Sequence, residues 1–202
     1  MIYDVLAAVS GFVLNIINSW DYTGVFLLMF LESANIPIPS EVIMPFSGFL
    51  AASGVFNFGE VVLIGALGNL AGSAVSYGIG YKYGERALRF LEKWHLFNKK
   101  DLEISERMFR QYGNTTAFWS RLLPVARTFI SLPAGVFKSK FWPFCLYTFA
   151  GSFLWSGFLT YLGLITGENW RILESYFRNF DIAIGGGIVL VLGWWIKRHF
   201  FY

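Results

Sequence analysis

The chain of 202 residues has little charge and few residues that bind metals or carry out catalysis. Only 14% of its residues are Asp, Glu, Lys or Arg, against roughly 25% in soluble domains, whereas 55% are hydrophobic and 20% aromatic. This composition excludes an ordinary soluble protein and predicts a single-domain integral membrane protein. The one cysteine, Cys145, cannot form an internal disulfide. The only histidines are His95 and His199, and no acidic cluster resembles a metal site, so we expect no metal, no cofactor and no enzyme.

Positive charge is absent from the first 81 residues. Lysine and arginine begin at Lys82, and eight of the sixteen lie within residues 82–110. By the positive-inside rule this loop is cytoplasmic, and its helical spacing of apolar residues predicts an amphipathic surface helix over 82–111. Topology and attraction to anionic lipid explain the basic run, and we expect no nucleic-acid partner.

Hydrophobic runs long enough to cross a bilayer are few, because a spanning helix needs about 20 apolar residues. We predict spans at 58–81, 141–166 and 182–196, the last followed by basic residues that place the C-terminus in the cytoplasm. Residues 5–20 form a shorter run. They either cross the membrane or lie in its interface.

Two further apolar stretches, 22–52 and 113–137, are interrupted by proline. Non-helical backbone at membrane depth is tolerated only where protein or water covers it. We therefore predict two helical hairpins, each entering and leaving the membrane on one side. The residues expected to break them are Pro37, Pro39 and Pro45 in the first hairpin and Pro124, Pro133 and Gly135 in the second.

Each hairpin carries a pair of charges of one sign. Glu32 and Glu41 flank the prolines of the first, and Arg121 and Arg127 flank Pro124 in the second. An arginine at the bilayer centre costs roughly 2.5–3.5 kcal/mol, so such residues usually have a function. The two arginines lie about 240° apart on an unbroken helix. A break at Pro124 lets them converge, which predicts an anion site.

The two halves of the chain repeat one pattern of a broken hairpin followed by a span. The spans share Ala-Gly-Ser, at 71–73 and at 150–152. One crossing separates the hairpins, so they enter from opposite faces, the first from outside and the second from inside. The predicted fold is therefore all-α: a polytopic membrane protein with two inverted repeats and a C-terminal transmembrane helix, the plan of many secondary transporters.

The residues of both hairpins also resemble a known family. The pattern Arg-x-x-Pro-x-x-Arg-Thr-Phe-Ile-Ser-x-Pro-Ala-Gly over 121–135 is similar to the signature of the DedA family of bacterial membrane proteins. The stretch from Glu32 to Glu41 resembles that family's other motif, and the resemblance spans roughly residues 20–165. One departure is Val125, where many members have glycine.

The resemblance implies a carrier that returns undecaprenyl phosphate from the outer to the inner leaflet of the bacterial cytoplasmic membrane. Arg121 and Arg127 are expected to bind the phosphate, because guanidinium groups match phosphate oxygens and stay charged in apolar surroundings. Burial and a neighbouring arginine act in opposite directions on a carboxylate's affinity for a proton. Glu32 and Glu41 are therefore expected to couple transport to protons. The polar residues expected around the site are Asn35, Ser40, Thr128 and Ser131.

Three alternatives remain open from the residues. The four charges are also compatible with two ion pairs that only hold the hairpins together, although buried pairs are weak evidence for stability. Glu32 and Glu41 also suit a proton- or cation-coupled antiporter that supports the membrane potential. A broad phospholipid scramblase is a further variant, and a homo-oligomer is left open.

Overall fold

The computed structural model describes residues 2–36, 38–84, 86, 99–122 and 126–167, and this part of the chain is entirely helical where it has regular secondary structure. The helices are α1 (Ile2–Ser33), α2 (Ser40–Ala52), α3 (Phe58–Tyr83), α5 (Lys99–Tyr112), α6 (Thr115–Arg121), α7 (Ala126–Phe129), α8 (Ser131–Val136) and α9 (Phe141–Thr166). The predicted last span at 182–196 lies outside the described residues.

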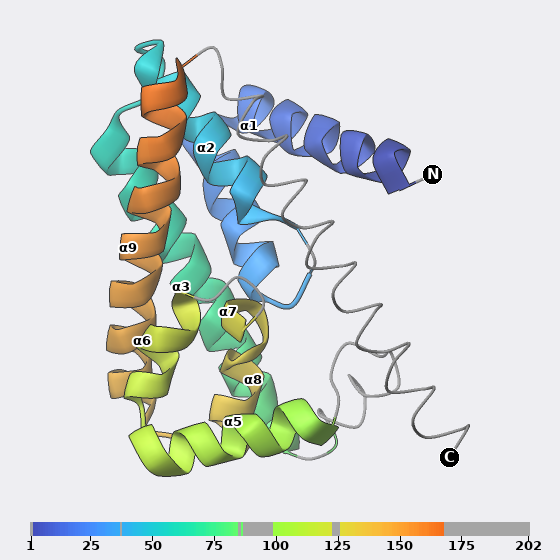
Figure 1. Ribbon diagram of the computed structural model, residues 1–202, viewed down its shortest axis with the longest axis vertical. Coiled ribbons are helices and arrows are strands. Elements are labelled where there is room, and N and C mark those ends of the chain that lie inside the picture. The colour runs from blue at the N-terminus through green and yellow to red at the C-terminus, as the bar shows by residue number, and fades with distance from the viewer. Residues whose placement is uncertain (1, 37, 85, 87–98, 123–125, 168–202) are drawn as a thin grey trace, which may run out of the picture.

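The two longest uninterrupted helices, α3 and α9, run along the length of the molecule and pack against each other (Figure 1). Each has 26 residues, which is about 39 Å at 1.5 Å per residue and enough to cross a hydrocarbon core of about 30 Å. By length and composition alone, Gly11–Ser33 is a third candidate span, but a kink at Asp21 divides it into two shorter helical arms. The structure is that of a multi-pass membrane protein.

Helix α1 consists of two arms that meet at a kink. Asp21 has φ 49° and ψ −131°, a conformation unfavourable for a non-glycine residue. The N-terminal arm runs across one end of the molecule, whereas the second arm descends beside α3 (Figure 1). Tyr22 fixes the second arm, because its ring stacks on Phe56 at 4.5 Å and its hydroxyl oxygen accepts a hydrogen bond from the Asn57 N–H. The kink falls between the two predicted segments, 5–20 and 22–52.

In the first hairpin the chain leaves the helix between Ser33 and Ser40. Asn35 takes a left-handed conformation, φ 70°, and the extended Pro39 precedes the first residue of α2. Pro37 lies outside the described residues. Pro45 does not interrupt the hairpin, since it lies inside α2.

The second hairpin has three short helices, α6, α7 and α8, where the sequence predicts two arms. Pro124 falls in residues 123–125, outside the described part of the chain. Pro133 and Gly135 lie within α8. Proline is accommodated there because it is the third residue of the helix, where an N–H has no partner within the helix.

The second arm of each hairpin crosses the long helix of the other half at a pair of glycines. Helix α2 packs on α9 and α8 packs on α3. A Cβ atom on Gly163 would lie 2.0 Å from the carbonyl oxygen of Pro45, and one on Gly135 would lie 2.0 Å from that of Tyr77. Gly48 and Gly80 face the same crossings from the other side, with the nearest oxygens at 2.1 and 2.2 Å. Both crossings therefore require glycine.

Helix α5 runs across the opposite end of the molecule from the N-terminal arm of α1 (Figure 1). Its residues Arg107 and Arg110 are exposed, whereas Ser105 is buried against the bundle. Its Met108 carbonyl accepts a hydrogen bond from Thr116 Oγ1, which ties α5 to α6. Helix α5 covers the second half of the predicted basic segment; residues 85 and 87–98 lie outside the described part.

Candidate functional site

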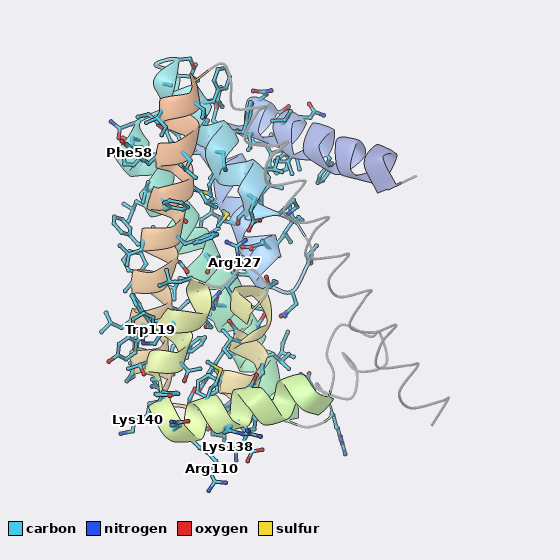
Figure 2. All side chains as sticks on the ribbon, in the orientation of Figure 1. Phe58, Arg110, Trp119, Arg127, Lys138 and Lys140 are labelled. Carbon is cyan, nitrogen blue, oxygen red and sulfur yellow. The ribbon has the colours of Figure 1, made fainter. Side chains whose placement is uncertain are left out.

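Four charged side chains meet inside the helical bundle, about midway between its ends at the level of Arg127 (Figure 2). Glu32, Arg121 and Arg127 are 2%, 1% and 3% exposed, and the Glu41 side chain is 12% exposed. Glu32 ends the second arm of α1 and Glu41 begins α2, while α6 and α7 supply the arginines. The structure thus brings together the four charged residues that the sequence singles out, and their formal charges cancel.

Arg121 is held by hydrogen bonds to neutral groups. Its Nη1 donates to Asn69 Oδ1 at 3.1 Å and to the Arg127 carbonyl at 2.8 Å. Its Nη2 donates to Ser73 Oγ at 2.9 Å and Ser131 Oγ at 2.7 Å. Because these bonds join α6 to α3, α7 and α8, Arg121 fixes the second hairpin against the long helix.

Arg127 instead contacts both carboxylates through a single nitrogen. Its Nη2 lies 2.9 Å from Glu32 Oε1 and 2.9 Å from Glu41 Oε1, and it also donates to Ser40 Oγ. The guanidinium carbon lies 5.2 Å from the ring centroid of Trp155, within the range of a cation–π contact. Arg127 therefore joins the broken segments of the two hairpins.

The remaining nitrogens of Arg127 are buried without a hydrogen-bond partner. Both Nε and Nη1 lack an acceptor among the described residues, as does Nε of Arg121. A guanidinium has five N–H donors, and a buried charged donor without an acceptor is costly. The site thus presents unused donors at a cation whose charge is balanced by two carboxylates.

Asn69 connects the two arginine-centred networks. Its Nδ2 donates to Glu32 Oε2 at 3.2 Å, while its Oδ1 accepts from Arg121 and from Ser152 Oγ at 2.6 Å. It is 3% exposed, in the middle of α3. The amide links an acid of the first hairpin to a cation of the second.

The charged cluster lies largely within a recognisable domain. A family model described as the VTT domain matches residues 38–165, well over half of the chain. The chain belongs to the VTT-domain family. This membership confirms the resemblance to the DedA family. Arg121, Arg127 and Glu41 lie inside the matched region of the VTT domain, and Glu32 lies just before it.

Several bacterial proteins are similar to this VTT-domain protein over most of its length. An uncharacterised membrane protein, YkoX of Bacillus subtilis, is 38% identical over 85% of this chain and 76% of its own. A Lactococcus lactis protein named alkaline phosphatase-like is 29% identical over 94% of this chain and 92% of its own. Undecaprenyl phosphate transporter A of Bacillus subtilis is 29% identical over 92% of this chain and 93% of its own. No solved structure gives a significant match.

The polar residues predicted around the charged cluster differ in their contacts. Ser40 and Ser131 accept hydrogen bonds from the arginines. Asn35 donates to the Thr128 carbonyl at 3.0 Å and accepts from Ser76 Oγ at 2.7 Å, so it closes the gap between the two hairpins. Thr128 enters this contact through its backbone.

Sequence reasoning missed several polar groups supplied by the two long helices. Asn69, Ser73 and Ser76 come from α3, and Ser152 and Trp155 come from α9. Ser73 and Ser152 belong to the repeated Ala-Gly-Ser, which suggests only small residues for close packing. The available signal was Asn69, an amide in an otherwise apolar span.

The described residues contain no group of three His, Cys, Asp or Glu side chains that could hold a metal ion. The chemistry present is that of carboxylates, guanidinium groups, hydroxyls and amides. Groups of these kinds can bind an oxyanion and exchange protons.

Proposed function

We propose that this VTT-domain protein carries the lipid undecaprenyl phosphate from the outer to the inner leaflet of a bacterial cytoplasmic membrane. The observation that carries the proposal is Arg127, a buried guanidinium with unused N–H donors that is held by two carboxylates on the opposing hairpin. A lipid needs only its head group to pass through such a core, because its tail can stay in the hydrocarbon.

The mechanism is an exchange of partners at Arg127. A phosphate monoester carries about −1.5 to −2 charges at pH 7 and has three strong acceptor oxygens. It accepts from Nε or from Nη1 of Arg127, each of which forms a planar fork with Nη2, and so competes with Glu32 and Glu41 for Nη2. A carboxylate that loses its cation in a buried site takes up a proton, since an unpaired buried charge is costly. Phosphate binding and proton uptake thus occur together, and release of the phosphate returns the protons.

The arrangement of the helices supports two re-entrant hairpins in inverted repeats. The second arm of α1, Tyr22–Ser33, is about 18 Å long, and α2 is about 20 Å long, so neither crosses about 30 Å of hydrocarbon. Each hairpin packs its second arm on the long helix of the other half. In this proposal the α5 end faces the cytoplasm, as its basic residues favour.

The substrate is proposed from the named relative together with the site. Undecaprenyl phosphate transporter A of Bacillus subtilis is similar over nearly the whole chain. Undecaprenyl phosphate has the phosphate monoester that a guanidinium with several free donors accommodates. A phospholipid scramblase is less consistent with such a specific ionic site.

The decisive experiment measures movement of undecaprenyl phosphate between leaflets of proteoliposomes. Arg127→Ala and Arg121→Ala are compared with native protein, with and without a pH gradient, and phosphatidylglycerol serves as the selectivity control. Arg127→Lys retains a charge but loses donors, and Arg107→Ala removes an exposed cation from α5 as a matched control. We expect the Arg127 variants to lose about 10- to 100-fold in rate, since hydrogen bonds to charged groups are worth about 1.5–3 kcal/mol.

A proton-coupled antiporter is the second candidate, favoured by the two carboxylates that share one cation. It predicts that folded Arg127→Lys keeps proton flux while Glu32 and Glu41 variants lose it. If undecaprenyl phosphate moves equally fast in native and Arg127→Lys proteoliposomes, the phosphate-carrier proposal is wrong.

A further inference from the structure

A second concentration of positive charge lies at the α5 end, away from the buried cluster. Arg110, Lys138 and Lys140 lie together at this end, well below Arg127 in the view of Figure 2. They line a cavity of about 580 Å³ between the C-terminal half of α5 and the turn that joins α8 to α9. The three cations and Glu106, which also lines the cavity, give it a formal charge of +2.

The wall that carries the two lysines is held by hydrogen bonds. The N–H groups of Lys138 and Ser139 donate to the carbonyls of Gly135 and Ala134, both at 3.0 Å. Tyr77 Oη donates to the Ser139 carbonyl at 2.5 Å, and Asn114 Nδ2 donates to the Lys140 carbonyl at 2.9 Å. Four hydrogen bonds, to α8, α3 and the α5–α6 connection, thus fix the backbone of this turn. The lysine Cα positions are set by the fold.

The cavity also adjoins features of a membrane surface. Helix α9 begins immediately after Lys140, has no acidic residue in its first turn and directs its unpaired N–H groups toward this end. Phe109 and Phe137, with ring centroids 6.2 Å apart, form the apolar part of the cavity lining. Trp142, 79% exposed, is the second residue of α9, as expected of an aromatic residue at a membrane interface.

We propose that this cavity is a second binding site, which takes the phosphate monoester head of a membrane lipid at the surface of the bilayer. Its role as the place where a carried lipid arrives rests on the proposed function; binding itself does not. The charge of +2 matches a monoester of about −1.5 to −2 better than a phosphodiester head group of −1. The phenylalanine rings offer apolar contact to the first part of a lipid tail, which inorganic phosphate lacks.

The test counts bound lipid by native mass spectrometry of the full-length protein in zwitterionic mixed micelles. Undecaprenyl phosphate, phosphatidylglycerol and inorganic phosphate are titrated separately. The double variant Lys138→Gln/Lys140→Gln removes two cations from the cavity. Lys82→Gln/Arg86→Gln removes two exposed cations from the same end that do not line it. Each double variant lowers the net charge by two.

We expect the cavity variant to bind undecaprenyl phosphate about 25-fold more weakly, whereas the control stays within about threefold of native protein. Phosphatidylglycerol is expected to bind native protein more weakly than undecaprenyl phosphate, and inorganic phosphate is expected to compete only at far higher concentration. Equal losses in both double variants indicate diffuse surface attraction and overturn the proposal. Equal binding of phosphatidylglycerol, or of inorganic phosphate, overturns the assignment to a lipid monoester.

Failure of this site is distinguishable from failure of the carrier mechanism. Lys138 and Lys140 lie outside the buried cluster, so their variant tests surface binding, while Arg127→Lys tests transport. Loss of transport in Arg127→Lys, together with loss of lipid binding in Lys138→Gln/Lys140→Gln, supports both proposals. Native transport in Arg127→Lys, with loss of binding in the lysine variant, supports only the surface site.

Discussion

Arg121 and Arg127 carry the same charge, but their surroundings give them different roles. Both terminal nitrogens of Arg121 donate hydrogen bonds to amide, carbonyl and hydroxyl oxygens, so Arg121 holds α6, α7 and α8 in place. Arg127 pairs with carboxylates and keeps free donors. The first is suited to positioning and the second to ligand exchange.

Asn69 connects the hydrogen-bond networks of Arg121 and Arg127 and sets the geometry of both. Asn69→Ala leaves Arg121 Nη1, Ser152 and Glu32 each without one partner, and we expect it to cost about 1–3 kcal/mol of stability. It should also shift the pH dependence of transport, because Glu32 loses a donor. Thermal unfolding in detergent and transport rates over a pH series measure the two effects.

The matched control is Asn57→Ala on the same helix. Asn57 caps α3 by accepting from the N–H groups of Gly59 and Glu60, and it lies far from the site. Asn57→Ala should lower the free energy of unfolding by about 1 kcal/mol without changing the pH dependence of transport. An Asn69 variant that follows the same pattern as this control would show that the amide only stabilises the fold.

Glu41 is the more accessible of the two carboxylates and so the better candidate for exchanging protons with water. Glu41→Gln cannot release a proton, while Glu32 still balances Arg127 at 2.9 Å. We expect the acceleration of transport by an acidic exterior to shrink severalfold, because one of the two proposed proton sites is lost while Glu32 remains. The measurement is the ratio of initial rates with and without the gradient, with Glu60→Gln as an exposed control. An unchanged ratio for Glu41→Gln excludes this carboxylate from coupling.

At the scale of helices, close approach at the two crossings sets the position of the hairpins. Gly163→Ala introduces a Cβ 2.0 Å from the Pro45 carbonyl oxygen, and we expect a loss of about 1–3 kcal/mol by overpacking. The control is Gly78→Ala on α3, where no atom lies within 4 Å; alanine there should be neutral or stabilising by about 0.5–1 kcal/mol. Thermal unfolding midpoints of both variants measure whether the added Cβ destabilises the crossing. Equal midpoints would mean that the crossing relaxes without cost.

The sequence predicts helices and charges better than it predicts how they are joined. Burying Glu32, Arg121 or Arg127 costs a large free energy unless the charge meets a partner. The presence of these residues in an apolar chain therefore indicates that they share a site. The gap between the predicted segments 5–20 and 22–52 marks the position of the kink, but the positive φ of Asp21 was not predicted. Pro45 and Pro133 were expected to break helices, yet they lie inside α2 and α8. The hydroxyls of Ser73 and Ser152 have no distinguishing pattern, since small residues in spans usually serve packing.

At the scale of the whole molecule, transverse elements lie at both ends of the long helices. Val55 lies in the α2–α3 connection beside Phe58, at the end opposite Lys140 (Figure 2). The distribution of positive charge predicts that the Lys140 end is cytoplasmic. In a Cys145→Ser background, Val55→Cys should react with a membrane-impermeant thiol reagent in intact cells. Lys140→Cys should react only after the membrane is opened. Labelling of both positions from outside would reverse the proposed orientation.

The balance of charge in the buried cluster has an electrical consequence. A cell interior that is negative opposes the inward passage of a dianion, and each elementary charge costs ~2.3 kcal/mol per 100 mV. In the proposed cycle the two carboxylates take up two protons as one phosphate dianion binds, so the cluster with bound phosphate is as neutral as the empty cluster. The membrane potential then does no net work on this cycle, and a pH difference across the membrane is sufficient to drive transport. A carrier built in this way continues to operate in a cell whose membrane potential has collapsed.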